Sequence, residues 1–108
     1  MRELEKLIMK LYLDTSKREK IIIGIDKNRF EANAKEGNSQ ELLPFIDKIL
    51  RKNGFTVKDI TEIEVNTGPG SFTGLRVGVA IANTLGFVLN VSVNDTLVLM
   101  RPVEIIYK

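Results

Sequence analysis

The chain has 108 residues, of which 44% are hydrophobic and 28% charged, and its formal net charge is +2. This composition is typical of one soluble globular domain, and so small a charge argues against direct binding to a nucleic-acid backbone. The chain has no cysteine and no histidine. Disulfides, thiolate metal sites, histidine-ligated metals and serine–histidine catalysis are therefore excluded within it.

Residues 1–8 alternate charged residues with leucine, and we interpret them as an extension before a domain that begins at Met9. They are too acidic for a signal peptide. The longest apolar run, residues 77–89, includes Asn83 and Thr84 and is too short to span a bilayer. We expect a cytoplasmic protein that makes no membrane contact.

Three strands are predicted first. Residues 11–13 begin a strand that ends at residues 14–16, which favour a turn. Residues 20–25 are β-branched enough for a buried strand, and residues 29–34 alternate polar and apolar as a more exposed strand does. Residues 26–28 suit a hairpin turn, so the three strands form an antiparallel meander.

A helix is predicted next. Asn38 followed by Glu41 resembles a capping box that starts the helix, and Asn53-Gly54 ends it. Pro44 lies beyond the first turn of this predicted helix, where it should bend it. One face of the helix holds the apolar residues Leu42, Leu43, Phe45, Ile46, Ile49 and Leu50.

The second half of the chain alternates strands with helices. Residues 61–65 form a strand that leads through a glycine loop into a helix over residues 71–89, and residues 91–93 form another strand. This order implies parallel pairing of the later strands. Residues 103–107 suit a last strand. We therefore predict an α/β fold in which strand–helix crossovers follow the meander in one mixed sheet.

The glycine loop at residues 66–70 has two interpretations. A strand that turns through glycines into a helix points several N–H groups at one spot, which suits an anion. The spacing of Gly68, Gly70 and Gly74, however, fits neither a Walker A loop nor a dinucleotide fingerprint. A structural tight turn is the simpler interpretation, and a phosphate contact remains the alternative.

The turn at Asp14, Thr15 and Ser16 has the same two interpretations. Its hydroxyls can hold a phosphate while the aspartate lies near a bound Mg²⁺. Such a sequence is also common in turns that bind nothing.

The helix after the glycine loop carries Gly74, Gly78, Ala82 and Gly86 at intervals of four residues, so small side chains line one ridge. A glycine inside a helix costs up to about 1 kcal/mol relative to alanine, which suggests that another backbone approaches closely. The opposite side is also apolar, with Val77, Ala80, Ile81, Phe87 and Val88. We favour a partner chain that covers this helix. The alternative is that the two predicted helices cover each other.

Three segments together resemble the TsaB family in order and spacing: residues 11–16, 38–46 and 68–78. The resemblance extends from Met9 to Asp95. It implies an RNase H-like fold of the actin/Hsp70 (ASKHA) type. TsaB is the dimerisation subunit of the bacterial machinery that makes threonylcarbamoyladenosine in tRNA, so the resemblance implies a non-catalytic role.

The family also implies partners. TsaB is similar to the catalytic subunit TsaD but lacks its metal-binding histidines, and it pairs with TsaD through helices of this domain. A TsaE-like ATPase joins them, and tRNA is met only indirectly. The resemblance implies no metal or cofactor of its own, except that ATP or ADP with Mg²⁺ can sit near the subunit interface.

The resemblance assigns site residues by position. The implied partner interface comprises Leu43, Ile46, Ser71, Gly74, Gly78, Ala82 and Gly86. The predicted nucleotide site comprises Asp14, Thr15 and Ser16, which match the family's degenerate phosphate loop, together with Gly68 and Gly70 of the glycine loop.

Two departures from the family pattern stand out. Asn38 occupies a position where TsaB proteins usually have histidine, and the second, similar domain of TsaB is expected to be absent. We divide the chain into an extension (1–8), a TsaB N-terminal domain (9–96) and a tail or short strand (97–108). A minimal TsaB, a fragment or a decayed paralogue each fit this division. The alternative function is half of an ASKHA-type ATPase or kinase that binds ATP-Mg through Asp14 and the glycine loop, and a homodimer is a further option.

Overall fold

The computed structural model describes residues 8–33, 42–98 and 101–106. Its strands are β1 (Lys10–Asp14), β2 (Lys20–Ile25), β3 (Asn28–Asn33), β4 (Glu62–Val65), β5 (Ser92–Val93) and β6 (Thr96–Leu97). Its helices are α2 (Leu42–Lys52), the short 3₁₀ helix η1 (Val57–Asp59) and α3 (Phe72–Leu89).

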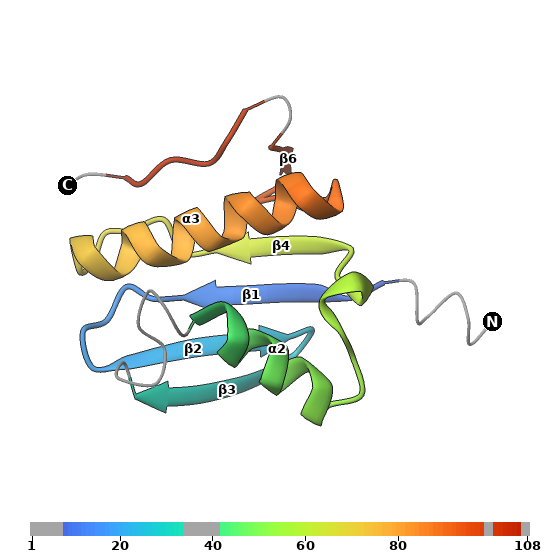
Figure 1. Ribbon diagram of the computed structural model, residues 1–108. Coiled ribbons are helices and arrows are strands. Elements are labelled where there is room, and N and C mark those ends of the chain that lie inside the picture. The colour runs from blue at the N-terminus through green and yellow to red at the C-terminus, as the bar shows by residue number, and fades with distance from the viewer. Residues whose placement is uncertain (1–7, 34–41, 99–100, 107–108) are drawn as a thin grey trace.

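The strands form one mixed sheet in the order β3-β2-β1-β4-β5-β6 (Figure 1). The first three strands pair antiparallel, as the predicted meander requires. β4 lies parallel to β1, and β5 lies parallel to β4, as the predicted crossovers require. The α/β fold expected from the sequence is confirmed.

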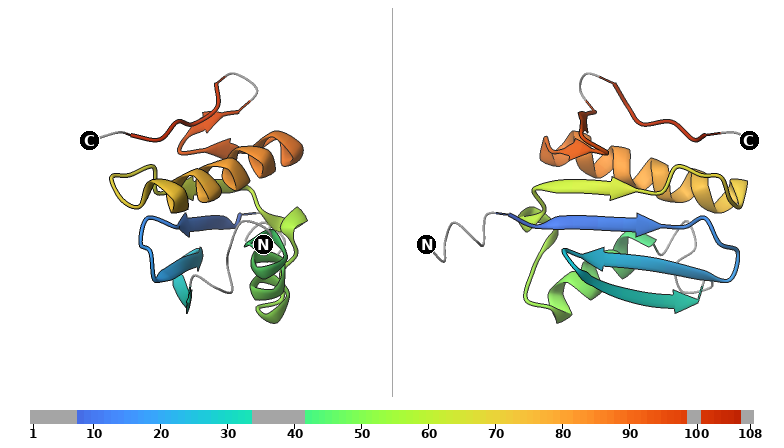
Figure 2. Two further views of the ribbon diagram at one scale, coloured as in Figure 1. Left: turned by 60° about the vertical axis from the view of Figure 1, so that its left-hand side comes forward. Right: turned by 180° about the vertical axis from the view of Figure 1, so that it is seen from behind.

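Both long helices lie on the same side of the sheet (Figures 1 and 2). α3 packs against β1, β4 and β5. α2 lies over the half of the sheet that contains β2 and β3. No helix of the described chain covers the other face, which carries exposed ion pairs such as Lys10–Glu64 at 2.9 Å.

The hydrophobic core lies between this sheet and the two helices. Alternate strand residues point into it because successive side chains of a strand point to opposite faces. The fully or nearly fully buried strand residues are Leu11, Leu13, Ile21, Ile23, Ile25, Ile63, Val65 and Val93. The helices contribute Leu42, Ile46, Leu50, Leu75, Val79, Ala82 and Leu85.

α2 ends at the predicted position, but the bend predicted at Pro44 in its first turn is not expected from the structure. Gly54 has a φ of 86°, and the N–H groups of Gly54 and Phe55 bond to the carbonyls of Arg51 and Leu50 at 3.1 and 2.9 Å. This is the Schellman arrangement that glycine favours. Pro44 lies in the first turn of α2, where a missing N–H costs no helical bond, so the expected bend has no cause. The predicted capping box lies outside the described residues.

The C-terminal segment differs from the prediction. Residues 101–106 form no strand, and β6 is the last strand among the described residues. The segment instead runs alongside α3 (Figure 1). Of the predicted N-terminal extension, the structure describes only Ile8, which is largely exposed.

α3 is longer than the apolar run identified in the sequence. It has 18 residues and is long and apolar enough to cross a membrane, and 33% of it is buried. The expectation that no apolar segment reaches this length is therefore wrong. Since the core helix of a soluble domain meets the same criteria, and one side of α3 packs on the sheet, this finding by itself carries little weight for a membrane location.

Candidate functional site

The structure brings together the residues that the sequence assigned to a phosphate site. Because β1 and β4 are parallel neighbours, the turn after β1 lies beside the loop after β4. Thr15 lies against Gly74 near the start of α3, and Ser16 lies against Gly70 in the glycine loop. The two sequence motifs therefore form one cluster.

Asp14 is the polar centre of this cluster. Its Oδ1 accepts hydrogen bonds from the Ser16 N–H at 2.9 Å, the Ser16 hydroxyl at 2.6 Å and the Asn66 amide at 3.2 Å. Burial raises the pKa of the Asp14 carboxyl, but these hydrogen bonds lower it by more, so the pKa lies below its usual range. The ionised carboxylate thus ties the turn after β1 to the loop after β4.

The glycine loop packs directly on this turn. The Ser71 N–H donates to the Ser16 carbonyl at 2.7 Å. A Cβ on Gly70 would lie 2.6 Å from the Ser16 Cβ, so only glycine fits there. Gly68 has a φ of 116°, and its N–H donates to the Asn66 side chain at 2.9 Å. These contacts support the structural interpretation of the loop.

The nucleotide site stays a prediction. The described residues contain no group of three or more acidic side chains that could together hold a metal ion. Asp14 is 7% exposed, and the Ser71 N–H at the start of α3 already has a partner in the chain.

The small-residue ridge of α3 has a different partner from the one expected. A Cβ on Gly74 would lie on the Thr15 carbonyl oxygen, and a Cβ on Gly78 would lie on the Thr15 hydroxyl. That hydroxyl donates to the Gly74 carbonyl at 2.6 Å. Ala82 is fully buried, and a Cβ on Gly86 would lie 2.6 Å from the Val93 side chain. The atoms that approach the ridge therefore belong to this chain: the Thr15 carbonyl at Gly74, and mainly side chains at Gly78 and Gly86.

This geometry corrects the predicted partner interface. Gly74, Gly78, Ala82 and Gly86 face this chain's own fold, and Ile46 is fully buried in its core. Gly78, Ala82, Gly86 and Ile46 are buried, so a partner cannot reach them without unpacking the domain, whereas Gly74 is half-buried. Ser71 caps α3, where its hydroxyl accepts from the Gly74 N–H at 3.4 Å. Leu43 is 37% exposed, so its assignment to an interface stays a prediction.

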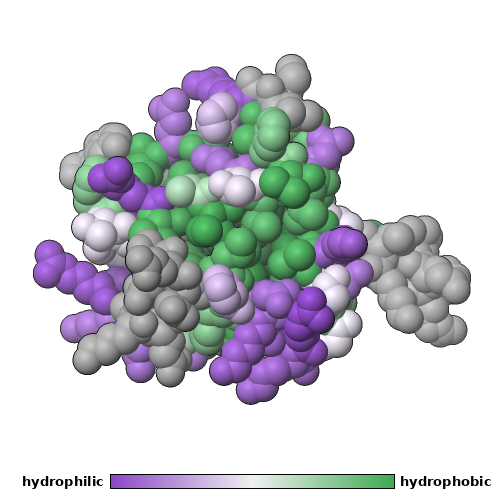
Figure 3. Space-filling model, viewed as in Figure 1, coloured by the Kyte–Doolittle hydropathy of each residue, from purple (hydrophilic) through white to green (hydrophobic). Residues whose placement is uncertain are grey.

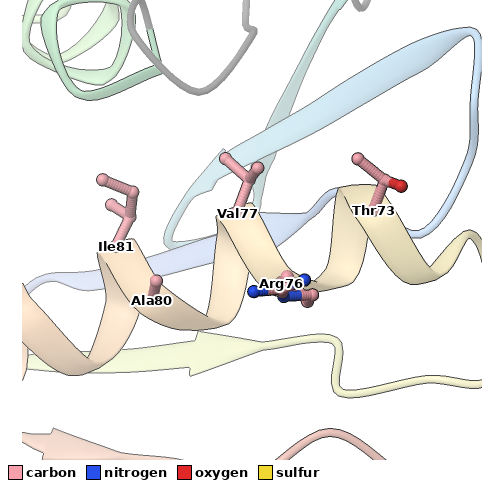
Figure 4. Close-up of a pocket in the computed structure, with 5 residues that line it drawn as sticks. All are labelled: Thr73, Arg76, Val77, Ala80 and Ile81. Carbon is pink, nitrogen blue, oxygen red and sulfur yellow. The ribbon is translucent and has the colours of Figure 1, made fainter.

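The surface of α3 that is free for contact lies on its outer side. Figure 4 shows Thr73, Val77 and Ile81 pointing the same way from α3, with Arg76 and Ala80 on the neighbouring side. These residues line an open hollow. Nearly two turns after Ile81, Phe87 is 58% exposed and Val88 is 70% exposed.

Apolar surface gathers across the middle of the face that carries both helices (Figure 3). The sequence carries a signal for this surface, since Val77, Ala80, Ile81, Phe87 and Val88 make the side of α3 opposite the glycines apolar as well.

Comparisons with known proteins agree with the predicted family. A family model described as "TsaD: tRNA N6-adenosine threonylcarbamoyltransferase" matches residues 32–95, more than half of the chain. TsaB of Haemophilus influenzae is 37% identical over 62 residues, which cover 57% of this chain and 26% of that protein. TsaB of Buchnera aphidicola from Baizongia pistaciae is 35% identical over 83 residues, which cover 74% and 38%.

A solved structure supports the same relationship. YeaZ from Pseudomonas aeruginosa superposes with a TM-score of 0.62 at 25% identity, covering 79% of this chain and 41% of that one. This likeness confirms the predicted RNase H-like fold. The chain spans between about a quarter and two fifths of the length of these relatives. By the extent of the family match, and with TsaB proteins as its relatives, the chain belongs to the TsaD family.

Proposed function

We propose that the chain is a non-catalytic dimerisation subunit that supports a TsaD-like transferase in threonylcarbamoyladenosine modification of tRNA. The observation that carries this proposal is the exposed apolar side of α3. The relatives named above supply the pathway, since they are described as threonylcarbamoyladenosine biosynthesis proteins.

The outer side of α3 has the properties of a binding surface. Phe87, Val88, Val77 and Ile81 lie exposed or half-buried on one helix, and Arg76 is the charged residue among those that line its hollow. Burying one such large side chain completely contributes about 1.5–3 kcal/mol. A helix that carries several of them is expected to gain from a partner that covers it.

The partner that fits is a subunit with an apolar helix of its own. Ala80 has a small side chain between the larger side chains of Arg76, Val77 and Ile81, and these residues line a shallow hollow on the α3 face. A helix laid along this face would fill the hollow and cover Val77 and Ile81. We propose a TsaD-like subunit as this partner, because the matching family model is that of the transferase. A TsaE-like ATPase as a third component stays a prediction.

The Asp14 cluster supports the non-catalytic part of the proposal. Its carboxylate and the Ser71 N–H are both engaged in hydrogen bonds that hold the fold together. In the ATPase alternative the same groups would contact ATP-Mg. Calorimetry with ATP and Mg²⁺ separates the two functions, because binding at millimolar ligand that Asp14→Asn removes would favour the alternative.

Co-purification with the cognate TsaD-like subunit tests the proposal. We expect the two proteins to co-elute in gel filtration at micromolar concentrations, and Ala80→Glu to abolish co-elution because it places a charge in the middle of the apolar face. Lys58→Glu is the matched control, since Lys58 is also exposed but lies in η1, away from α3.

Two results would contradict the proposal. One is wild-type protein that fails to co-elute. The other is co-elution that Ala80→Glu and Lys58→Glu leave equally intact. A complex of two copies that Ala80→Glu dissociates would show that the face binds this chain instead of a transferase. Circular dichroism of both variants controls for folding.

A further inference from the structure

The segment at residues 101–106 is held beside α3 mainly through its main chain. The Asn83 amide on α3 donates to the Val103 carbonyl at 2.9 Å and accepts from the Val103 N–H at 3.0 Å. Three residues on, the Ile106 N–H donates to the Thr67 carbonyl at 2.7 Å. The Asn83 side chain thus bonds to both main-chain groups of Val103, and the Thr67 carbonyl bonds to the main chain of Ile106.

The side chains of the segment alternate as those of a strand do, although it belongs to no sheet. Val103 and Ile105 are partly buried and pack against the core cluster, whereas Glu104 and Ile106 are exposed. Gly68 makes room at the far end, because a Cβ there would lie 2.9 Å from the Ile106 carbonyl oxygen.

The space between the segment and the helix is only partly filled. An open hollow there is lined by Arg76, Val79 and Ala80 of α3 and by residues 103–105. Arg76 and Glu104 thus border the same hollow with opposite charges. The groove therefore has an apolar floor, a cation on its rim, and main-chain contacts at each end.

We propose that this groove is a receptor for an extended peptide with the pattern aliphatic–acidic–aliphatic, and that residues 101–106 occupy it as an exchangeable internal ligand. The contacts at Asn83 and Thr67 engage main-chain groups, which every non-proline residue offers, so they accept any extended segment. Selection comes from the two inward aliphatic side chains and from the acidic residue near Arg76. The groove shares Arg76 and Ala80 with the α3 face proposed for dimerisation. Its main-chain contacts at Asn83 and Thr67 lie outside that face, so Asn83→Ala tests the groove separately.

The proposal is tested with a capped, fluorescently labelled peptide that has the sequence of residues 101–106. In the variant Val103→Asp/Ile105→Asp of this chain, the internal segment is weakened while Asn83, Thr67 and the α3 side of the groove are unchanged. We expect the peptide to bind this variant at least about tenfold more tightly than wild type, since the internal competitor is gone. Adding Asn83→Ala should weaken binding by about fivefold or more, because two hydrogen bonds are lost.

A matched peptide and a second measurement complete the test. A peptide that carries Asp at both aliphatic positions should not bind. In wild-type protein, saturating peptide should accelerate amide hydrogen exchange at Val103 and Ile106, because it displaces the internal segment. Peptide binding that Asn83→Ala leaves unchanged would overturn the proposal. So would the absence of binding to both proteins, or binding to wild type without faster exchange at Val103.

Discussion

Gly78→Ala is the substitution that best distinguishes a ridge packed inside the domain from one that awaits a partner. A Cβ at Gly78 would collide with the Thr15 hydroxyl and lie 3.1 Å from the Thr15 Cγ2. Moving Thr15 aside would break its 2.6 Å hydrogen bond to the Gly74 carbonyl. The new methyl group therefore has no free space and also disrupts a polar contact.

The magnitude follows from two opposing contributions. Alanine gains up to about 1 kcal/mol over glycine in helix propensity. Overpacking costs about 1–3 kcal/mol, and leaving a buried polar group unpaired costs about 1–3 kcal/mol. We expect net destabilisation of about 2 kcal/mol, which corresponds to a fall in Tm of roughly 8–16 °C for a domain of this size.

Urea and thermal unfolding of the isolated chain, followed by circular dichroism, measure this effect. Thr15→Ala removes two of the three atoms that the new methyl group meets, so the double variant should be at least about 1 kcal/mol more stable than the sum of the single effects predicts. Ala80→Gly on the exposed side is the control and should cost only about 1 kcal/mol. A Gly78→Ala protein that is more stable than wild type, with effects that add to those of Thr15→Ala, would refute the close packing of Gly78 against Thr15.

Further substitutions test the remaining contacts. Asp14→Asn should cost about 1–3 kcal/mol of unfolding free energy at neutral pH. The pKa of Asp14 is lowered in the folded protein, so its contribution to stability is complete above the unfolded pKa of about 4 and is lost as the pH falls further. The unfolding free energies of variant and wild type, measured by urea titration, should therefore converge below about pH 4. Ile46→Ala should cost about 2–5 kcal/mol, whereas Leu43→Ala should cost about 1 kcal/mol or less, since only Ile46 is fully buried; equal losses would contradict this. Gly54→Ala should cost about 1 kcal/mol through its positive φ alone, because nothing lies within 4 Å of the new Cβ, and an unchanged urea midpoint would argue against that reasoning.

The elements that the sequence predicted correctly are those specified by local chemistry. The β-branched run at Lys20–Ile25 is a strand in almost any setting, and Asn53-Gly54 ends a helix because glycine tolerates the left-handed conformation there. The crossovers follow from the order of elements, because a helix between two strands favours parallel pairing.

What the sequence could not predict depends on contacts distant in the chain. The four-residue spacing of small residues indicates a close approach, but it does not say whose backbone approaches. The answer is Thr15, which lies 59 residues before Gly74. Since α3 is apolar all round, its pattern also gives no clear inner side. Residues 103–105 alternate as a strand does, yet their main-chain partners are the Asn83 side chain and, at Ile106, a loop carbonyl.

The close approach of Thr15 has a consequence for the proposed interface. Gly74 and Gly78 let α3 settle on the turn after β1, so the small-residue ridge is occupied by this chain and the side chains left on the outer side are larger ones such as Val77 and Ile81. A partner at this face would therefore meet Val77, Ile81 and Phe87 instead of glycine backbone. Such an interface is stabilised by interlocking apolar side chains, so its affinity should depend on their volume and not on the close contact of two helix backbones.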